Sequence, residues 1–293
     1  MGSAIQQDCT SSKFRRIGQG FCGTVWAAEG GKLAMKREDG GPGRSLLNDY
    51  NMHTLVLETA SQQKVNVRVP RWPEFFKSED GWWGMRSNRL HSLQRALRRT
   101  QPTTAAGAIA TIKANDADRD CLVRPYLGRR KIQNETRRGR NFFSLRNYPL
   151  HLNQAEDLDL PILEYSHGMA EILAMMHWTA KIDANDIEFV LGGVQPQPEI
   201  ARKEYTHDFL GTHSLWVLDF DCCKPLTMDD AGIDQAARAF LRNDPTLWIE
   251  FRTRYLECSQ NFVTGTGVTC LGLPEKFIAR VAEMHQKGTE QSH

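Results

Sequence analysis

The first part of the chain alternates short apolar segments with polar and glycine-rich turns, a pattern that is typical of antiparallel strands. Three such segments cover residues 14–17, 18–26 and 33–36. Two more, at 65–76 and 82–85, flank a polar turn. We therefore expect a small antiparallel sheet.

One amphipathic segment interrupts these strands. Residues 45–58 mix leucines and Tyr50 with polar residues, which favours a helix with one buried face. Residues 121–126 predict a last strand that runs into a hinge. We assign residues 1–126 to a small, β-rich lobe that also contains a basic insertion at 86–99.

The remaining residues, 127–293, are mainly helical in pattern. A long buried helix is expected over residues 163–180, because apolar side chains recur there at helical spacing: Met169, Ile172, Leu173 and Met176. Two short apolar segments predict strands at 189–191 and 215–218. Further helices are expected at 234–241, 246–255 and 274–285. The pattern thus predicts an α+β protein with a larger, mainly helical second lobe.

The composition is that of a globular protein. Of 293 residues, 40% are hydrophobic and 25% are charged, and no apolar run is long enough to span a bilayer. Residues 1–12 lack the features of a secretory signal, so we expect a cytoplasmic protein and no membrane partner. Seven scattered cysteines include no C-x-x-C pair, and we expect no metal site.

Positive charge is concentrated although the net charge is only +2. Residues 124–146 hold eight Lys and Arg side chains against the single acid Glu135. Such a segment can bind phosphates or form a solvated basic loop. The candidate nucleic-acid contacts are Arg129, Arg130, Lys131, Arg137, Arg138 and Arg140.

A glycine-rich turn is followed by a lysine on the next expected strand. The spacing is G-x-G-x-x-G-x-V from Gly18 to Val25, then Ala34-Met35-Lys36. Backbone N–H groups around Gly20, together with Lys36, could bind a phosphate-bearing ligand. A simple glycine turn is the alternative. Asp49, in the expected helix, is placed to pair with Lys36.

Five carboxylates fall in the two segments where a protein kinase has its catalytic residues: Asp183, Asp186, Glu188, Asp219 and Asp221. The kinase spacing H-R-D-x-x-x-x-N is preserved from Asp183 to Glu188, and Asp219-Phe220 corresponds to the start of D-F-G. The residue types differ, because Lys181 and Ile182 precede Asp183 and glutamate replaces asparagine. A protein-kinase-like two-lobed fold with altered chemistry is expected.

Two interpretations of these acids stay open. They could hold a divalent cation for phosphoryl transfer from ATP. Alternatively, crowding could raise the pKa of one carboxylate, which would then act as a base toward an ammonium group. For Asp186 and Asp221, capping of a helix or turn is an equal alternative.

Two neighbouring features have structural rather than chemical interpretations. His177 lies within the expected long helix and is assigned to packing. Cys222 and Cys223 could supply a nucleophile, but nearby acids disfavour the thiolate, so packing is expected.

Segments of nearly the whole chain, from about residue 14 to 258, resemble a fungal domain of unknown function with kinase-like ancestry that also occurs beside zinc fingers. The resemblance rests on residues 18–26, 45–53, 183–193 and 218–221. Within that family, chains of this size resemble the arginine-containing cyclodipeptide synthases, which make cyclo-arginine-Xaa dipeptides from aminoacyl-tRNAs.

This resemblance implies a catalytic group of Asp183, Asp186, Glu188 and Asp219. Asp221, Lys36 and Gly20 would contribute to substrate binding, and the basic segments would contact tRNA. Aminoacyl esters are already activated, so no cofactor is implied and no protein partner is expected. The alternatives are a small-molecule phosphotransferase that uses ATP and Mg²⁺, with Asp183 as base, and a binding module without turnover.

Overall fold

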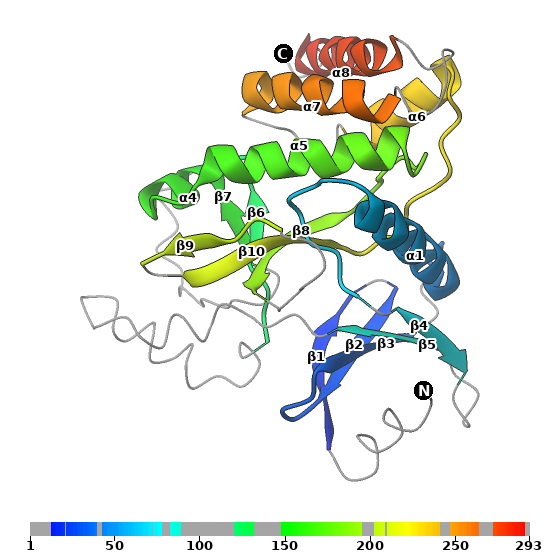
Figure 1. Ribbon diagram of the computed structural model, residues 1–293, viewed down its shortest axis with the longest axis vertical. Coiled ribbons are helices and arrows are strands. Elements are labelled where there is room, and N and C mark those ends of the chain that lie inside the picture. Colours follow the sequence, from blue (N-terminus) through cyan, green and yellow to red (C-terminus); the bar gives the residue numbers. More distant parts are fainter. Residues whose placement is uncertain are drawn as a thin grey trace.

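The computed structural model describes residues 13–20, 22–39, 43–71, 73–77, 83–88, 120–131, 148–194, 202–208, 210–240, 247–263 and 272–290. Figure 1 shows two parts, a small sheet with one helix and a larger part in which helices cover a second sheet.

The small sheet has five antiparallel strands in the order β1-β2-β3-β5-β4. The strands are β1 Phe14–Gln19, β2 Gly23–Ala28, β3 Leu33–Glu38, β4 Glu74–Lys77 and β5 Trp83–Asn88. Gly23 is needed where β2 meets β3, because a Cβ atom there would lie 1.9 Å from the carbonyl oxygen of Arg37.

The strand expected at 65–76 is shorter than predicted. Only residues 74–77 belong to the small sheet. Residue Arg68 instead pairs with the second sheet, where its N–H donates to Leu215 O at 2.9 Å and its carbonyl accepts from Val217 N at 2.9 Å. These hydrogen bonds, together with the buried Val65, Val67 and Val69, attach this segment to the larger lobe.

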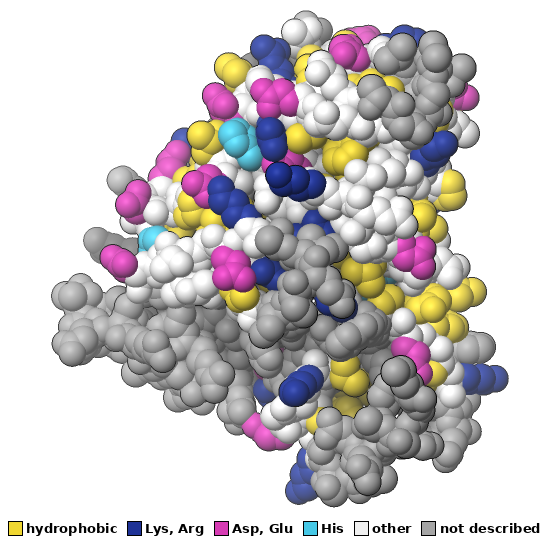
Figure 2. Space-filling model, viewed as in Figure 1, with side chains coloured by type: hydrophobic (Ala, Val, Ile, Leu, Met, Phe, Trp, Pro, Cys, Tyr) yellow, Lys and Arg dark blue, Asp and Glu magenta, His cyan; other side chains and the backbone are white. Residues whose placement is uncertain are grey.

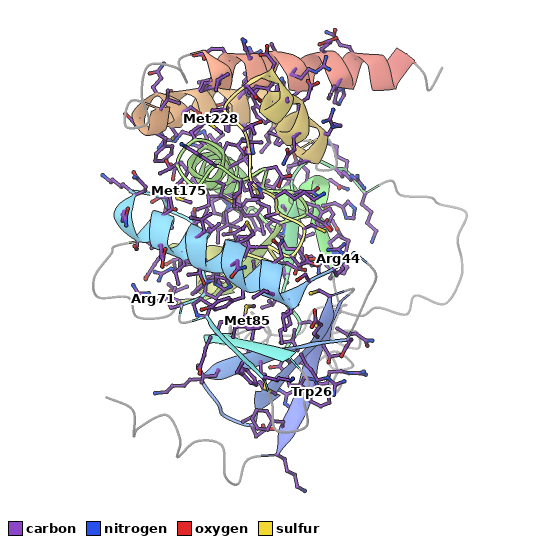
Figure 3. The ribbon with its side chains drawn as sticks, turned by 90° about the vertical axis from the view of Figure 1, so that its right-hand side faces the viewer. Trp26, Arg44, Arg71, Met85, Met175 and Met228 are labelled. Carbon is purple, nitrogen blue, oxygen red and sulfur yellow. The ribbon has the colours of Figure 1, made fainter. Side chains whose placement is uncertain are left out.

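Helix α1, Leu46–Gln62, lies between the two parts (Figures 1 and 3). Ser45 caps it, since its side chain accepts a hydrogen bond from Asn48 N at 3.2 Å. The buried face includes Asp49, which is 1% exposed although it is charged. Arg44 stands directly before this cap and faces the seam between the lobes (Figure 3).

A parallel pair of short strands, β6 Arg124–Tyr126 and β7 Pro149–His151, connects the small sheet to the helices that follow. Helices α4, Leu152–Asp157, and α5, Ile162–Trp178, follow. Most of α5 is buried, which agrees with its apolar pattern. The proposed lobe boundary after residue 126 stays a prediction.

A three-stranded sheet faces the cleft. Strand β8, Glu188–Gly193, and strand β9, Tyr205–His207, both pair antiparallel with β10, Gly211–Leu218. The register puts Glu188 opposite Leu218, so Glu188 and Asp219 are neighbours at one end of the sheet.

Three more helices complete the lobe: α6 Asp230–Phe240, α7 Trp248–Val263 and α8 Leu273–Glu290. Each extends beyond its expected range at one end or both. Aromatic side chains of α6, α7 and α8 pack on α5 around Tyr255 and Phe277, both fully buried. The predicted α+β arrangement, with a small β-rich lobe and a larger, mainly helical lobe, is confirmed. Among the described helices, none has the length and apolar character needed to cross a membrane.

Candidate functional site between the lobes

Two cavities meet at the seam. The smaller, of about 310 Å³, lies under the small sheet, and the larger, of about 720 Å³, extends into the helical lobe. Both are lined by Gln19, Gly20, Cys22, Arg124, Glu188 and Asp219. Four of the five carboxylates predicted from the sequence, Asp183, Asp186, Glu188 and Asp219, therefore line this two-armed hollow, and Asp221 does not.

Lys36 joins the two lobes at this seam. Its Nζ lies 2.6 Å from Asp49 Oδ2 and 2.8 Å from Asp219 Oδ1. Burial opposes the charge of Lys36, but the two carboxylates outweigh it and raise the pKa of the lysine above its usual value. The expected pairing of Lys36 with Asp49 is confirmed. Asp219 engages the same ammonium group, so Lys36 links the small sheet, α1 and the segment after β10.

The glycine turn closes on itself. The N–H of Gly20 donates to the carbonyl oxygen of Gly23 at 2.9 Å, so this N–H is not directed at a ligand. Gly20 still lines both cavities. Its expected part in substrate binding stays a prediction.

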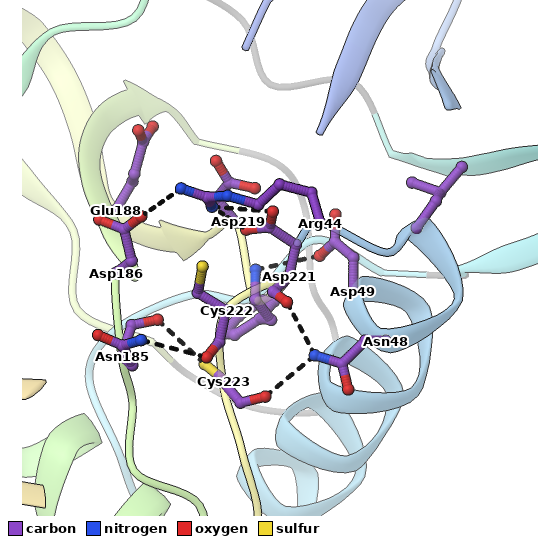
Figure 4. Close-up of polar contacts among 12 residues, drawn as sticks. Arg44, Asn48, Asp49, Asn185, Asp186, Glu188, Asp219, Asp221, Cys222 and Cys223 are labelled. Atoms are coloured by element: carbon purple, nitrogen blue, oxygen red, sulfur yellow. Dashed lines mark hydrogen bonds and ion pairs between the residues drawn. The ribbon is translucent and has the colours of Figure 1, made fainter. Parts of the chain in front are cut away.

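Arg44 forms a second link between the lobes, which sequence reasoning missed. Its guanidinium binds both oxygens of Asp221 at 2.9 Å and reaches Asp186 Oδ2 at 3.0 Å (Figure 4). Hydrogen bonds to Asp221 are the main cause that raises the pKa of Arg44. The Asp221 side chain is 1% exposed, and Arg44 neutralises its charge. The only signal in the sequence was a basic residue next to a helix cap.

Asn48, one turn into α1, secures the same contact. Its side-chain amide donates to the backbone carbonyls of Asp221 and Cys223 at 2.9 and 3.0 Å (Figure 4). The helix end and the segment after β10 are therefore fixed relative to each other.

Glu188 Oε1 lies 2.6 Å from Arg124 Nη2, and the Glu188 side chain is 23% exposed. Burial raises the pKa of Glu188 to about 7, Arg124 opposes that shift, and Asp219 adds to it. A carboxylic acid with this pKa exchanges its proton near neutral pH. Arg124, which belongs to the basic segment expected to contact tRNA, contributes to the acidic site instead.

Asp183 has a different environment from the other acids. Its Oδ1 accepts hydrogen bonds from Lys224 N at 2.8 Å and Asn185 N at 3.2 Å, and its Oδ2 accepts from Gln235 Nε2 at 2.9 Å. The residue is 4% exposed. Both oxygens are engaged in holding the loop, so the geometry favours a structural role over the predicted catalytic one.

Two separate segments that carry these acids, the loop before β8 and the residue directly after β10, have strained backbone. Ala184, Asp186 and Asp219 have φ values of 51°, 63° and 66°, in the left-handed region that such residues rarely adopt. Such strain persists only where surrounding contacts fix the backbone, and it concentrates at functional sites.

The expected repulsion among crowded acids is largely offset. Asp49, Asp186, Glu188, Asp219 and Asp221 each contact a cation. Three cations serve them, namely Lys36, Arg44 and Arg124. The shifted pKa of Glu188 therefore has burial, not crowding, as its main cause.

The predicted nucleic-acid residues are only partly placed. Arg129 lines the larger cavity. Arg130 pairs with Glu156 through two contacts of 2.6 and 2.7 Å, and Lys131 lies 6.0 Å from the ring centre of Tyr148. Arg137, Arg138 and Arg140 lie outside the described residues, as does most of the insertion at 86–99. Figure 2 shows basic and acidic side chains interspersed on one face.

The packing roles expected for His177 and for the Cys222–Cys223 pair agree with the structure. His177 is fully buried, its Nδ1 lies 2.8 Å from Tyr255 OH, and burial lowers the pKa of His177 to about 3. Burial raises the pKa of the Cys223 thiol well above its usual value, and it raises that of Cys222 in the same direction. Neither thiol is activated.

Within the described parts of the chain, no group of three or more His, Cys, Asp or Glu side chains is arranged to hold a metal ion. The acids that a kinase would use for magnesium are bonded to cations, Asp219 to Lys36 and Glu188 to Arg124. The residues as placed do not fit a magnesium site.

Comparisons with known proteins give a partial family match. Residues 215–266 match a family model described as DUF3669, zinc finger protein. This agrees with the expected resemblance to a domain that occurs with zinc fingers. No curated protein matches the chain.

Several solved structures are similar to the chain at low scores. The GDP complex of wild-type aminoglycoside 2'-phosphotransferase-IIIa is 11% identical with a TM-score of 0.32, covering 99% of this chain and 96% of that one. A GDP and kanamycin complex of a related phosphotransferase is 12% identical with a TM-score of 0.33, covering 99% and 97%. Similarity at this level carries no information about what this chain binds.

Proposed function

We propose that the chain is an aminoacyl-tRNA-dependent cyclodipeptide synthase that joins arginine to a second amino acid. The observation that carries the proposal is Glu188, a carboxylate on the wall shared by both cavities, with a pKa raised to about 7. A free α-amino group has a pKa of about 7.7–8.0. Glu188 is therefore matched to accept a proton from such a group near neutral pH.

Two aminolysis steps would form the product. The α-amine of one aminoacyl-tRNA attacks the ester carbonyl of the other, and Glu188 takes the amine proton. The tRNA of the attacked ester leaves with a proton on its ribose oxygen, so the dipeptide stays on the tRNA of the attacking amine. The free α-amine of the resulting dipeptidyl-tRNA then attacks its own ester and releases the second tRNA and the diketopiperazine. Both bonds use esters that are already activated, so the chemistry consumes no ATP.

The acidic surroundings support arginine as one substrate. The side chains of Asp186 and Asp219 are 48% and 30% exposed, so each can offer oxygens to a guanidinium. The contact between Arg44 and the Asp186–Asp221 pair shows that carboxylates at this seam bind a guanidinium in two-pronged geometry.

A specific observation favours a second candidate, a small-molecule phosphotransferase. The Lys36–Asp49 ion pair has the geometry that kinases use to hold ATP phosphates, and the smaller cavity lies beside it. Against it stand Glu188 in place of the metal-binding asparagine and the engaged carboxylate of Asp183.

The test uses arginyl-tRNA and a mixture of other aminoacyl-tRNAs, charged beforehand and freed of ATP by gel filtration. We expect a cyclo-arginine dipeptide by mass spectrometry, and none after ribonuclease treatment. Parallel samples hold free amino acids with MgATP. Product that resists complete tRNA digestion, or that forms only with MgATP, would contradict the proposal, and release of phosphate from ATP would favour the phosphotransferase.

A further inference from the structure

The larger cavity has two chemically different ends. At the seam it is lined by Asp186, Glu188 and Asp219. At the other end, between α5, α6 and α7, its wall is apolar. The apolar wall consists of Met169, Leu173, Ile187, Phe189, Phe240, Leu247 and Phe251.

The apolar end is built from packed side chains. Leu173, Phe240 and Phe251 are 7%, 8% and 6% exposed. The rings of Phe240 and Phe251 lie 5.2 Å apart, and Phe251 stacks on Tyr255 at 6.2 Å. Such contacts fix the shape of the wall, so the hollow is preformed.

The polar groups at this end are mostly bonded within the protein, and His177 Nε2 is a buried atom without a hydrogen-bond partner among the described residues. His177 contacts Tyr255 OH and is uncharged at neutral pH. Both carboxylate oxygens of Asp183 accept hydrogen bonds from the loop and from Gln235. A charged side chain that entered this end would lose its water and meet only an uncharged imidazole and a carboxylate that already accepts hydrogen bonds, which is costly.

The reaction geometry requires two side chains to diverge from one point. Amine and ester must meet beside Glu188, so the two amino-acid side chains extend away from it. Only the acidic end suits a guanidinium. Building on the proposed function, we propose that the apolar end of the larger cavity binds the side chain of the second amino acid and selects a large apolar or aromatic residue.

The test replaces Met169 by tryptophan to fill this end, with Leu163→Trp as the matched control. Both residues lie on α5, but Leu163 is 46% exposed and does not line the cavity. Each enzyme receives arginyl-tRNA and an equal mixture of the other aminoacyl-tRNAs, and every cyclic product is quantified by mass spectrometry.

We expect wild type and Leu163→Trp to prefer Phe, Tyr, Trp, Leu or Met as partner. In Met169→Trp, the yield of products with an aromatic partner should fall at least tenfold relative to the product with alanine, because the indole ring fills space that the partner's side chain would occupy. A wild-type preference for charged or very small partners would overturn the inference, as would an unchanged product distribution in Met169→Trp.

A binding assay separates this inference from the proposed function. If wild type makes no cyclic dipeptide, the proposed function fails, and the hollow is tested by titrating L-tryptophanamide into the three proteins by calorimetry. We expect at least tenfold weaker binding in Met169→Trp alone. Equal binding by all three proteins, or none by wild type, would overturn the inference.

Discussion

The small-lobe wall and the large-lobe wall of the cleft keep their kinase-like spacing but differ in what that spacing produces. On the small-lobe wall, Lys36 pairs with Asp49 as the spacing predicts. On the large-lobe wall, Asp183 and Glu188 keep the kinase spacing along the sequence. The Asp183 carboxylate, however, accepts hydrogen bonds from the backbone of its own loop and of Lys224, whereas Glu188 lines both cavities. Preserved spacing therefore does not fix the environment of each acid, since Asp183 accepts backbone hydrogen bonds from Lys224 and Asn185, whereas Glu188 pairs with Arg124.

The largest expected effect is a loss of activity when Glu188, on the large-lobe wall, is replaced. Glu188→Gln should lower the initial rate of cyclic dipeptide formation by about 10²–10⁴-fold, since it removes the base while keeping the side-chain volume. The matched control is Glu156→Gln, which alters an ion-paired acid of α4 outside both cavities. A folded Glu188→Gln protein with the wild-type rate would exclude this carboxylate as the base.

The next effect concerns the small-lobe wall. Lys36→Met leaves Asp49, with 2% side-chain exposure, without its cation. We expect the free energy of unfolding to fall by about 3–5 kcal/mol, the usual cost of breaking a buried pair. Urea denaturation measures it, with Lys276→Met at an exposed ion pair as control. Equal midpoints for Lys36→Met and wild type would show that this pair has no structural role.

Asp183 provides a direct contrast with Glu188. Asp183→Ala removes the acceptor for Lys224 N and Asn185 N and should lower the free energy of unfolding by about 1–3 kcal/mol. Asp183→Asn keeps an acceptor oxygen, so its rate should stay within about tenfold of wild type, below the usual effect of losing a general base. A stable but inactive Asp183→Asn enzyme would return the catalytic role to this residue.

The smallest expected effect lies at the rim of the larger cavity. Arg129→Ala should reduce the salt dependence of tRNA binding by about 0.7–0.9 in the log–log slope, as expected for one lost phosphate contact. Fluorescence anisotropy across a salt series measures the slope, with Arg238→Ala on α6 as control. An unchanged slope would place the tRNA contacts away from Arg129.

Local features were predictable from the sequence because their partners are near in the chain. The Ser45-capped helix and the Lys36–Asp49 pair, 13 positions apart, are of this kind. Long-range pairing was not predictable. Arg44 and Asp221 are 177 positions apart, and no pattern indicates that one meets the other.

The role of each acid depended on contacts that spacing does not encode. Asp183 and Glu188 are equally acidic in sequence, but Gln235 and the backbone of Lys224 bind only the first. The segment at 65–70 was wrongly assigned to the small sheet because its apolar valines fit a strand in either lobe. Burial and pairing, which arise only in the folded chain, decided both outcomes.

The central claim, that Glu188 is the base, is tested most directly by the pH dependence of single-turnover dipeptide formation in wild type and Arg124→Gln. Since the carboxylate form is the base and its pKa is about 7, the wild-type rate should rise through about pH 7 and level off above it. Arg124 lowers the pKa of Glu188, so Arg124→Gln should move this midpoint to higher pH. A midpoint that is the same in both proteins would assign the titration to the substrate amine and contradict the claim.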